Sequence, residues 1–254
     1  MLDAGKYFLQ KQQRSIGVSE NELIKIAVKS LGLDELTPFN SQERIIEYLL
    51  ADLADSKLVN MKLNAFADET ASESPAPGGG SIAAYVGALG ASLATMVANL
   101  SSHKKGWDER WEEFSNWASK GQQVKDELIK LVDADTAAFN KIMEAFALPK
   151  TTDEEKVKRT NRIQEATKNA IEIPFKVMQT AAAAMPIVQA MATIGNPNSV
   201  SDAGVAALCI RSAVMGAFMN VRINAGSYND KNYVTEVAEK TVISNNATTG
   251  MYLW

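Results

Sequence analysis

One acidic residue interrupts an apolar helical stripe in the middle of the chain. Residues 128–146 repeat with the period of an α-helix, and their apolar members share one face. These members are Leu128, Leu131, Val132, Phe139, Ile142 and Phe146. Asp135 falls in the middle of that face, whereas Asp133 projects to another side. Burial raises the pKa of a carboxyl group toward neutrality, where it works well as a general acid or base. The alternative interpretation is a structural Asp that caps a neighbouring helix or pairs with an arginine.

A glycine-rich segment precedes another helix and is the second candidate. Residues 75–81 read Pro-Ala-Pro-Gly-Gly-Gly-Ser. Glycines permit close backbone approach to a ligand, and the free N–H groups at a helix start hold anionic or polar groups. Gly78, Gly79, Gly80 and Ser81 are therefore candidate binding residues. Neither a preceding strand nor a Gly-Lys-Ser/Thr sequence is present, so a Walker-type phosphate loop is excluded. A structural turn capped by Ser81 remains an equal alternative.

Two amides and two guanidinium groups mark a later apolar helix. Asn220 and Asn224 are one turn apart and share a face, so they hold neighbouring backbone or contact a ligand, with backbone bonding favoured. Arg211 and Arg222 share a side of the same helix and are candidates to pair with Asp135 or Asp202, or to bind a carboxylate.

The histidine and cysteine content excludes several kinds of site. His103 is the sole histidine, so we expect neither a metal site nor a Ser-His-Asp arrangement. Cys209 is the sole cysteine, which forbids an intrachain disulfide and agrees with a reducing cytoplasm. The net charge of −4 argues against a nucleic-acid partner.

The elements that position these residues are all expected to be helices. The chain has 254 residues, of which 46% are hydrophobic, and no stretch alternates with the period of a strand. We predict an all-α helical bundle with long, kinked helices. The predicted helices cover residues 64–71, 81–101, 124–146, 202–224 and 230–243. A further helix opens with a capping box at Thr152 and Glu155, bends or breaks at Pro174, and resumes toward residue 191.

The first part of the chain is predicted to be separate. Asn40 and Glu43 open an amphipathic helix whose apolar face holds Ile45, Ile46, Leu49 and Leu50. A polar, irregular stretch follows, so we place a boundary near residues 52–62 and divide the chain into 1–60 and 61–254. Residues 78–102 carry no charge and are long enough to span a bilayer. Their Gly, Ala, Ser and Thr content instead favours a buried helix in a soluble bundle, with no membrane contact.

Residues 75–81 and the small-residue helix after them resemble the formimidoyltransferase-cyclodeaminase family and the related methenyltetrahydrofolate cyclohydrolases. The likeness continues through residues 131–139, 148–150, 152–160, 195–196, 201–202 and 220–224. These separated motifs occur in the order of the family. Residues 31–48 resemble the end of the formimidoyltransferase domain and its linker. The rest of that domain has no counterpart here, so the resemblance does not imply transferase activity.

The resemblance implies a cytoplasmic, all-helical enzyme of one-carbon metabolism and histidine degradation. Its subunits pair as homodimers or larger homo-oligomers, and its folate groove lies near a subunit interface. The family's catalytic acid corresponds to Asp135, which agrees with the helical-face argument. The remaining motif positions are folate-site candidates: Gly78, Gly79, Gly80, Ser81, Lys150, Asp202, Asn220 and Asn224. The implied partners are a folate, with or without a polyglutamate tail, and a formimidoyltransferase domain.

The activity implied is closure of 5-formimidoyltetrahydrofolate to 5,10-methenyltetrahydrofolate with release of ammonia. It needs no metal and no cofactor beyond the folate substrate. Two alternatives stay open at this point. One is a methenyltetrahydrofolate cyclohydrolase, and the other is an inactive helical module that binds folate or serves as a scaffold.

Overall fold

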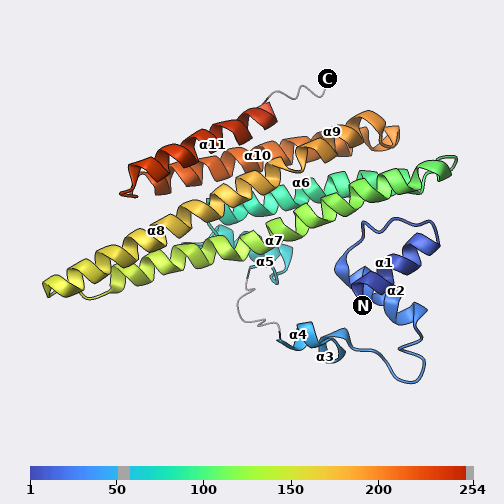
Figure 1. The fold of residues 1–254 in the computed structure, drawn as a ribbon, viewed down its shortest axis with the longest axis horizontal. Helices are drawn as coiled ribbons and strands as arrows, with labels where there is room; N and C mark the ends of the chain where they lie inside the picture. Colours follow the sequence, from blue (N-terminus) through green and yellow to red (C-terminus); the bar gives the residue numbers. More distant parts are fainter. Residues whose placement is uncertain (51–57, 250–254) are drawn as a thin grey trace.

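The computed structural model describes residues 1–50 and 58–249, with side chains described for 1–49 and 58–241. Every regular element within these ranges is a helix, which confirms the predicted all-α fold. Four long helices run side by side and form the bundle: α6 (Gly79–Ser102), α7 (Trp111–Ala147), α8 (Asp153–Ala182) and α10 (Val200–Ala225) (Figure 1). The shorter helices α9 (Met185–Ile194) and α11 (Lys231–Thr249) complete it.

Helix α6 is the centre of the bundle because its side chains are small. Ala83, Gly87, Ala91, Ala94 and Ala98 recur at three- and four-residue spacing along α6 and are all buried. A Cβ atom added to Gly87 would lie 3.1 Å from the Ala213 Cβ and 3.3 Å from a Leu128 methyl group. Helices α7 and α10 therefore approach α6 more closely than larger side chains permit.

Three helical stretches are long and apolar enough to cross a membrane, judged by length and composition alone: Gly79–Ser102, Asp153–Ile194 and Pro197–Ala225. In α6, 61% of the most apolar window is buried inside the bundle. The apolar character of this helix is thus used in packing against its neighbours.

Three of the predicted helix limits were wrong. The last helix, α11, continues to Thr249 rather than ending near residue 243. Helix α7 begins at Trp111 rather than near residue 124, because Phe114 and Ala118 bury a face of an otherwise polar stretch. Helix α8 continues through Pro174 to Ala182, and the chain breaks only before Met185 and Pro186 open α9.

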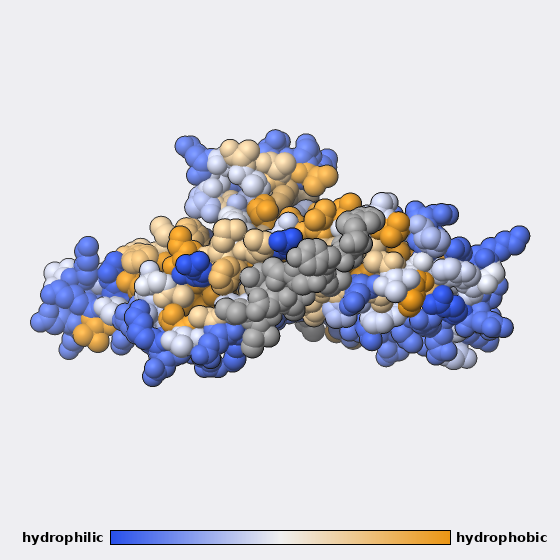
Figure 2. All heavy atoms as spheres, turned by 90° about the horizontal axis from the view of Figure 1, so that it is seen from above, coloured by the Kyte–Doolittle hydropathy of each residue, from blue (hydrophilic) through white to orange (hydrophobic). Residues whose placement is uncertain are grey.

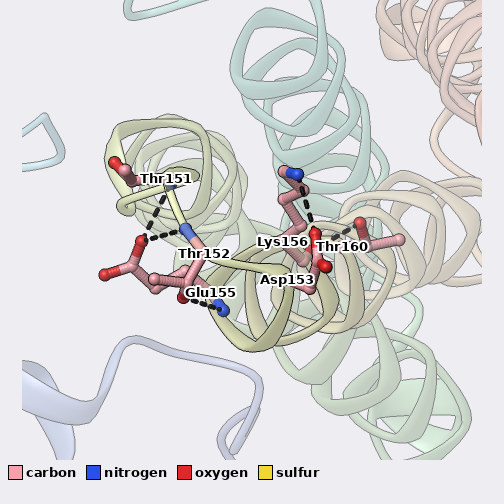
Figure 3. A network of polar contacts seen from close by, with 6 residues as sticks. All are labelled: Thr151, Thr152, Asp153, Glu155, Lys156 and Thr160. Atoms are coloured by element: carbon pink, nitrogen blue, oxygen red, sulfur yellow. Dashed lines mark hydrogen bonds and ion pairs between the residues drawn. The ribbon is translucent and has the colours of Figure 1, made fainter.

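The predicted capping box at the start of α8 is confirmed. The Thr152 hydroxyl accepts from the Glu155 backbone N–H at 3.2 Å. The Glu155 carboxylate accepts from the N–H groups of Thr151 at 2.8 Å and Thr152 at 2.9 Å (Figure 3). These backbone hydrogen bonds lower the pKa of Glu155. Lys156 pairs with Asp153 at 2.8 Å in the same turn. These capping contacts lie where the short connection from α7 enters α8. The tip of this α7–α8 hairpin projects beyond the other helices (Figure 1).

The N-terminal residues form a small group of helices beside the bundle (Figure 1). They are α1 (Leu2–Lys11), α2 (Glu20–Ser30), α3 (Ser41–Arg44) and α4 (Ile46–Leu50), followed after the undescribed residues by α5 (Leu63–Thr70). The link between α1 and α2 is tied to α6, since the Asn99 amide accepts from the Ser15 hydroxyl at 2.6 Å and donates to the Gly17 carbonyl at 2.8 Å.

The predicted apolar face after Asn40 was wrong. The helix is interrupted at Ile45, whose backbone is extended, so the residues on either side no longer share one face. Ile45 is buried, whereas Ile46 is 69% and Leu49 is 60% exposed; the Leu50 side chain lies outside the described residues. The proposed boundary falls largely on residues 51–57, which the structure does not describe, so the division into 1–60 and 61–254 stays a prediction.

Candidate functional site

A cleft of about 110 Å³ lies at the N-terminal end of α6. Four separate parts of the chain line it: the glycine-rich segment from Pro75 to Gly80, the α7 face around Asp135, Ala170 of α8, and the α10 residues Asn220 and Asn224. Phe139, Ile142 and Ala170 supply an apolar side. We call it the Asp135 cleft. Its mixture of apolar walls and a few converging polar groups is typical of a small-molecule site.

The Asp135 carboxylate caps the N-terminus of α6. Gly78 is the N-cap residue of α6 and has no side chain with which to cap it. Instead, the Ser81 hydroxyl lies 3.1 Å from Asp135 Oδ2, and the Ser81 backbone also hydrogen-bonds this carboxylate. A Cβ atom on Gly80 would lie 2.1 Å from Asp135 Oδ1, so this close approach requires glycine. The structural interpretation of Asp135 as a cap on a neighbouring helix is therefore realised.

Two opposing effects act on the Asp135 carboxyl group. Burial raises its pKa above the ordinary value of 3.8 and is the larger effect. The hydrogen bonds from the Ser81 side chain and backbone lower the pKa and offset part of the rise. No arginine contributes, so the alternative of an Asp–Arg pair is excluded for the described residues. The group takes up a proton closer to neutral pH than an exposed aspartate does.

The Ser81 hydroxyl has more acceptors within reach than it has hydrogens. It lies 2.9 Å from the Val132 carbonyl, 3.1 Å from Asp135 Oδ2 and 3.2 Å from Thr136 Oγ1. Its single hydrogen serves one acceptor at a time. When it points to Val132, the Ser81 oxygen is free to accept from a protonated Asp135. The same contacts therefore suit Asp135 in either protonation state.

The two asparagines face the glycine-rich segment from α10. Asn220 Nδ2 donates to the Gly216 carbonyl of its own helix at 2.9 Å. Asn224 Nδ2 donates to the Ala170 carbonyl of α8 at 2.6 Å. A Cβ atom on Gly79 would lie 3.3 Å from Asn220 Nδ2, so the backbone of α6 passes close to this amide. Both asparagines bond backbone, as the favoured interpretation of the sequence expected, and both also line the Asp135 cleft.

Two candidates are not brought to the cleft within one subunit. Lys150 follows the end of α7, and the helical rise alone puts that end about 18 Å from Asp135. Asp202 lies in the first turn of α10, about 27 Å along the helix from Asn220. Spacing along the sequence could not reveal this, because each motif matched separately.

Two contributors to the cleft were missed. Thr136 joins the polar contacts of Ser81 although it stands directly beside Asp135 in the sequence. Ala170 contributes a backbone carbonyl. The signal for Ala170 was Pro174, because a proline in a helix leaves the carbonyl four residues earlier without its usual donor.

His103 and Cys209 lie outside this cleft. Burial and the nearby Arg14 lower the pKa of His103, and burial raises the pKa of the Cys209 thiol. Among the described residues, no group of three His, Cys, Asp or Glu side chains is arranged to hold a metal ion.

The long-helix bundle and its cleft define an all-α protein with a small, partly polar cleft at a helix start. Residues 62–242 match the formiminotransferase-cyclodeaminase family model, and residues 1–51 match the formiminotransferase domain. The chain therefore belongs to the formiminotransferase-cyclodeaminase family, which confirms the resemblance drawn from the motifs.

Some relatives are named for two activities, and others are named for one. The formimidoyltransferase-cyclodeaminase of Gallus gallus is 39% identical over 94% of this chain, which spans only 44% of that protein. A methenyltetrahydrofolate cyclohydrolase of Methylorubrum extorquens is 37% identical over 70% of this chain and 85% of its own length. The crystal structure of formiminotetrahydrofolate cyclodeaminase from Thermotoga maritima is 27% identical with a TM-score of 0.68, covering 76% of this chain and 93% of that one.

The contact between Gly80 and Asp135 makes a testable prediction about stability. Gly80→Ala places a methyl group on the Asp135 carboxylate, and we expect it to lower the free energy of unfolding by about 1–3 kcal/mol. Gly78→Ala is the matched control, because its Cβ would meet only the Pro75 oxygen, at 3.8 Å. Urea unfolding of both variants measures the difference. Equal losses would contradict the assigned contact.

The raised pKa of Asp135 predicts the sign of a pH effect. The folded chain binds this proton more tightly than the unfolded chain, so the group's stabilising contribution is complete below pH 3.8 and is lost as pH rises through the raised pKa. Asp135→Asn removes the buried charge. Its melting temperature relative to wild type should therefore increase from pH 4 toward neutrality. A difference that falls over this range would refute the assignment.

Proposed function

We propose that this chain is a formimidoyltetrahydrofolate cyclodeaminase, which forms 5,10-methenyltetrahydrofolate and ammonia. Two observations about relatives support this. The Thermotoga maritima protein carries this activity in its name and is matched over 93% of its length. The bifunctional relatives match across both segments of this chain. The observation that carries the proposal is the Asp135 carboxyl group, which is partly buried, raised in pKa and open to a cleft.

The proposed reaction uses Asp135 to move one proton. Nitrogen 10 of the folate attacks the carbon of the protonated formimidoyl group on nitrogen 5, and a tetrahedral intermediate forms. Asp135 accepts the proton from nitrogen 10 and delivers it to the amine, which leaves as ammonia while the carbon–nitrogen double bond of the methenyl product forms. Both reacting atoms belong to one ligand, so holding them in position contributes as much as the proton transfer. Ser81 accommodates both protonation states of Asp135 during this cycle.

The proposed folate site includes the backbone of Gly78, Gly79 and Gly80 with Asn220 and Asn224 opposite. Lys150 and Asp202 remain candidates only for contacts beyond this cleft, such as the glutamate tail or a neighbouring subunit. No metal and no cofactor beyond the folate is part of the proposal. We place the enzyme in the cytoplasm and in histidine degradation, with residues 1–51 belonging to a formiminotransferase domain.

Cyclohydrolase activity is the second candidate, and one comparison favours it specifically. The Methylorubrum extorquens cyclohydrolase matches 70% of this chain at 37% identity. In that reaction water attacks the methenyl carbon, and a carboxyl group at Asp135 would serve as its base.

Purified chain mixed with 5-formimidoyltetrahydrofolate should give methenyl absorbance and ammonia faster than the uncatalysed closure. Asp135→Asn should lower kcat by about a hundred- to ten-thousandfold, because one acid-base group is lost. The pH effect on the stability of this variant, described above, serves as the control for folding. Hydrolysis of methenyltetrahydrofolate without any cyclodeamination would select the second candidate. Folate binding without turnover would select an inactive module.

We further propose that two copies of this chain associate through α6 and α10. Exposed apolar residues recur along α10: Val205, Leu208, Met215, Met219 and Ile223. Leu89, Met96 and Leu100 form a second exposed row on α6. In the view from above, apolar surface is concentrated over the middle of the molecule, between hydrophilic ends (Figure 2). Ile223 and Met219 adjoin Asn224 and Asn220, so a partner on this face borders the Asp135 cleft.

Light scattering after gel filtration tests the second copy. The wild-type chain should have the mass of a dimer or larger oligomer, and Leu208→Glu should shift it toward the monomer because Leu208, 64% exposed, lies mid-stripe. Leu36→Glu is the matched control, since Leu36 is 97% exposed on the N-terminal segment. A monomeric wild-type chain, or the same shift in both variants, would refute this surface.

A further inference from the structure

Pro174 leaves one backbone carbonyl of α8 without its helical partner. In an α-helix each N–H donates to the carbonyl four residues earlier, so residue 174 would serve Ala170. Proline has no N–H, and its ring also crowds that carbonyl. Ala170 is buried, with 5% of its surface exposed. A buried carbonyl with no donor is costly. The continuity of α8 through Pro174 therefore requires a donor from elsewhere.

Asn224 of α10 supplies that donor. Its Nδ2 lies 2.6 Å from the Ala170 carbonyl oxygen, across the contact between α8 and α10. This bond determines which end of the Asn224 amide faces α8. The nitrogen is held against the helix through one of its two N–H groups. Oδ1 is then the acceptor that the Asn224 side chain offers to the cleft it lines. Asn220 is oriented in the same way, with Nδ2 on the Gly216 carbonyl.

Backbone and side chains contribute different groups to the cleft: the start of α6 supplies N–H donors, whereas Asp135, Asn220 and Asn224 supply acceptors. Asn220 and Asn224 each have a carbonyl oxygen that accepts hydrogen bonds, and Asp135 adds carboxylate oxygens. These side-chain acceptors, with one negative charge among them, are complementary to a cationic group that carries N–H donors. An amidinium, like the guanidinium of arginine, is such a cation. The formimidoyl group is an amidine, whereas the methenyl carbon carries no N–H.

We propose that Pro174 and Asn224 form a matched pair that fixes Asn224 Oδ1 as an acceptor for the amidinium N–H groups of the formimidoyl substrate. Asn224 is thus a residue that determines specificity for the one-carbon group, and Pro174 is a positioning residue that acts through it. This inference rests on the proposed cyclodeaminase function. The proposed hydrogen bond favours binding of the formimidoyl substrate over folates whose one-carbon group has no N–H donor.

The structural half is tested by urea unfolding of four proteins: wild type, Asn224→Ala, Pro174→Ala and the double variant. Pro174→Ala restores a backbone N–H for the Ala170 carbonyl. We expect Asn224→Ala to lower the urea midpoint clearly in the wild-type background and much less in the Pro174→Ala background. Equal loss in both backgrounds would overturn the pairing of Pro174 with Asn224.

The recognition half is tested by equilibrium binding in an Asp135→Asn background. This change suppresses turnover and removes the Asp135 charge, so the preference that remains reports on the asparagine acceptors. The probes are 5-formimidoyltetrahydrofolate and 5-formyltetrahydrofolate, which replaces the N–H donor group with a carbonyl acceptor. We expect the formimidoyl ligand to bind at least about tenfold more tightly, the order of one hydrogen bond to a charged group. Asn224→Ala should reduce that preference toward one, also when Pro174→Ala has restored stability.

The outcomes of this experiment are distinguishable from those of the activity assay. Equal binding of the two ligands, or a preference that survives Asn224→Ala, would overturn the inference even if the wild-type chain turns over its substrate. A preference that depends on Asn224 would support the inference even if no ammonia is released, and the proposed function alone would then fail. Asn224→Asp in the Pro174→Ala background keeps the acceptor and should keep the preference, because the Ala170 carbonyl no longer needs the amide.

Discussion

The contact between the Asp135 carboxylate and the start of α6 is the constraint on which the rest of the bundle depends. A helix start leaves backbone N–H groups without partners, and the N-cap residue Gly78 has no side chain to serve them. A carboxylate from α7 does so instead, at a distance that only glycine at position 80 allows. Once α6 and α7 meet at this point, the alanines and glycines along α6 let the neighbouring helices pack at the same close range.

The same contact has a structural and a chemical consequence. Burial disfavours the charged carboxylate, while the helix start and Ser81 favour it, and burial prevails. The contact of Asp135 with Ser81 and the start of α6 therefore underlies both its capping role and its proposed role in proton transfer. A group that must cap a helix in one protonation state and carry a proton in the other needs a partner such as Ser81, whose hydroxyl donates or accepts.

On the opposite wall of the cleft, a backbone group that lacks its helical partner is likewise served by a side chain from another helix. Pro174 removes a donor from α8, and Asn224 of α10 replaces it at the Ala170 carbonyl. The missing N–H in α8 is thus replaced by a hydrogen bond between α8 and α10. This bond also fixes the orientation of the Asn224 amide beside the cleft. The apolar residues next to it on α10 stay exposed. The folding of the chain satisfies the Ala170 carbonyl but leaves this apolar face uncovered.

The sequence by itself determined the helices, the capping box at Thr152, the placement of Asp135 on an apolar face and the family. Periodicity and caps are local properties, so they can be read along the chain. Only the tertiary structure decided that residues 79–81, 135 and 220–224 meet, while Lys150 and Asp202 lie apart from them. It also decided that α8 survives Pro174, because the missing donor comes from another helix. The sequence pattern of a helix shows which of its sides is apolar. Only the packing of the fold decides which neighbouring helix that side contacts.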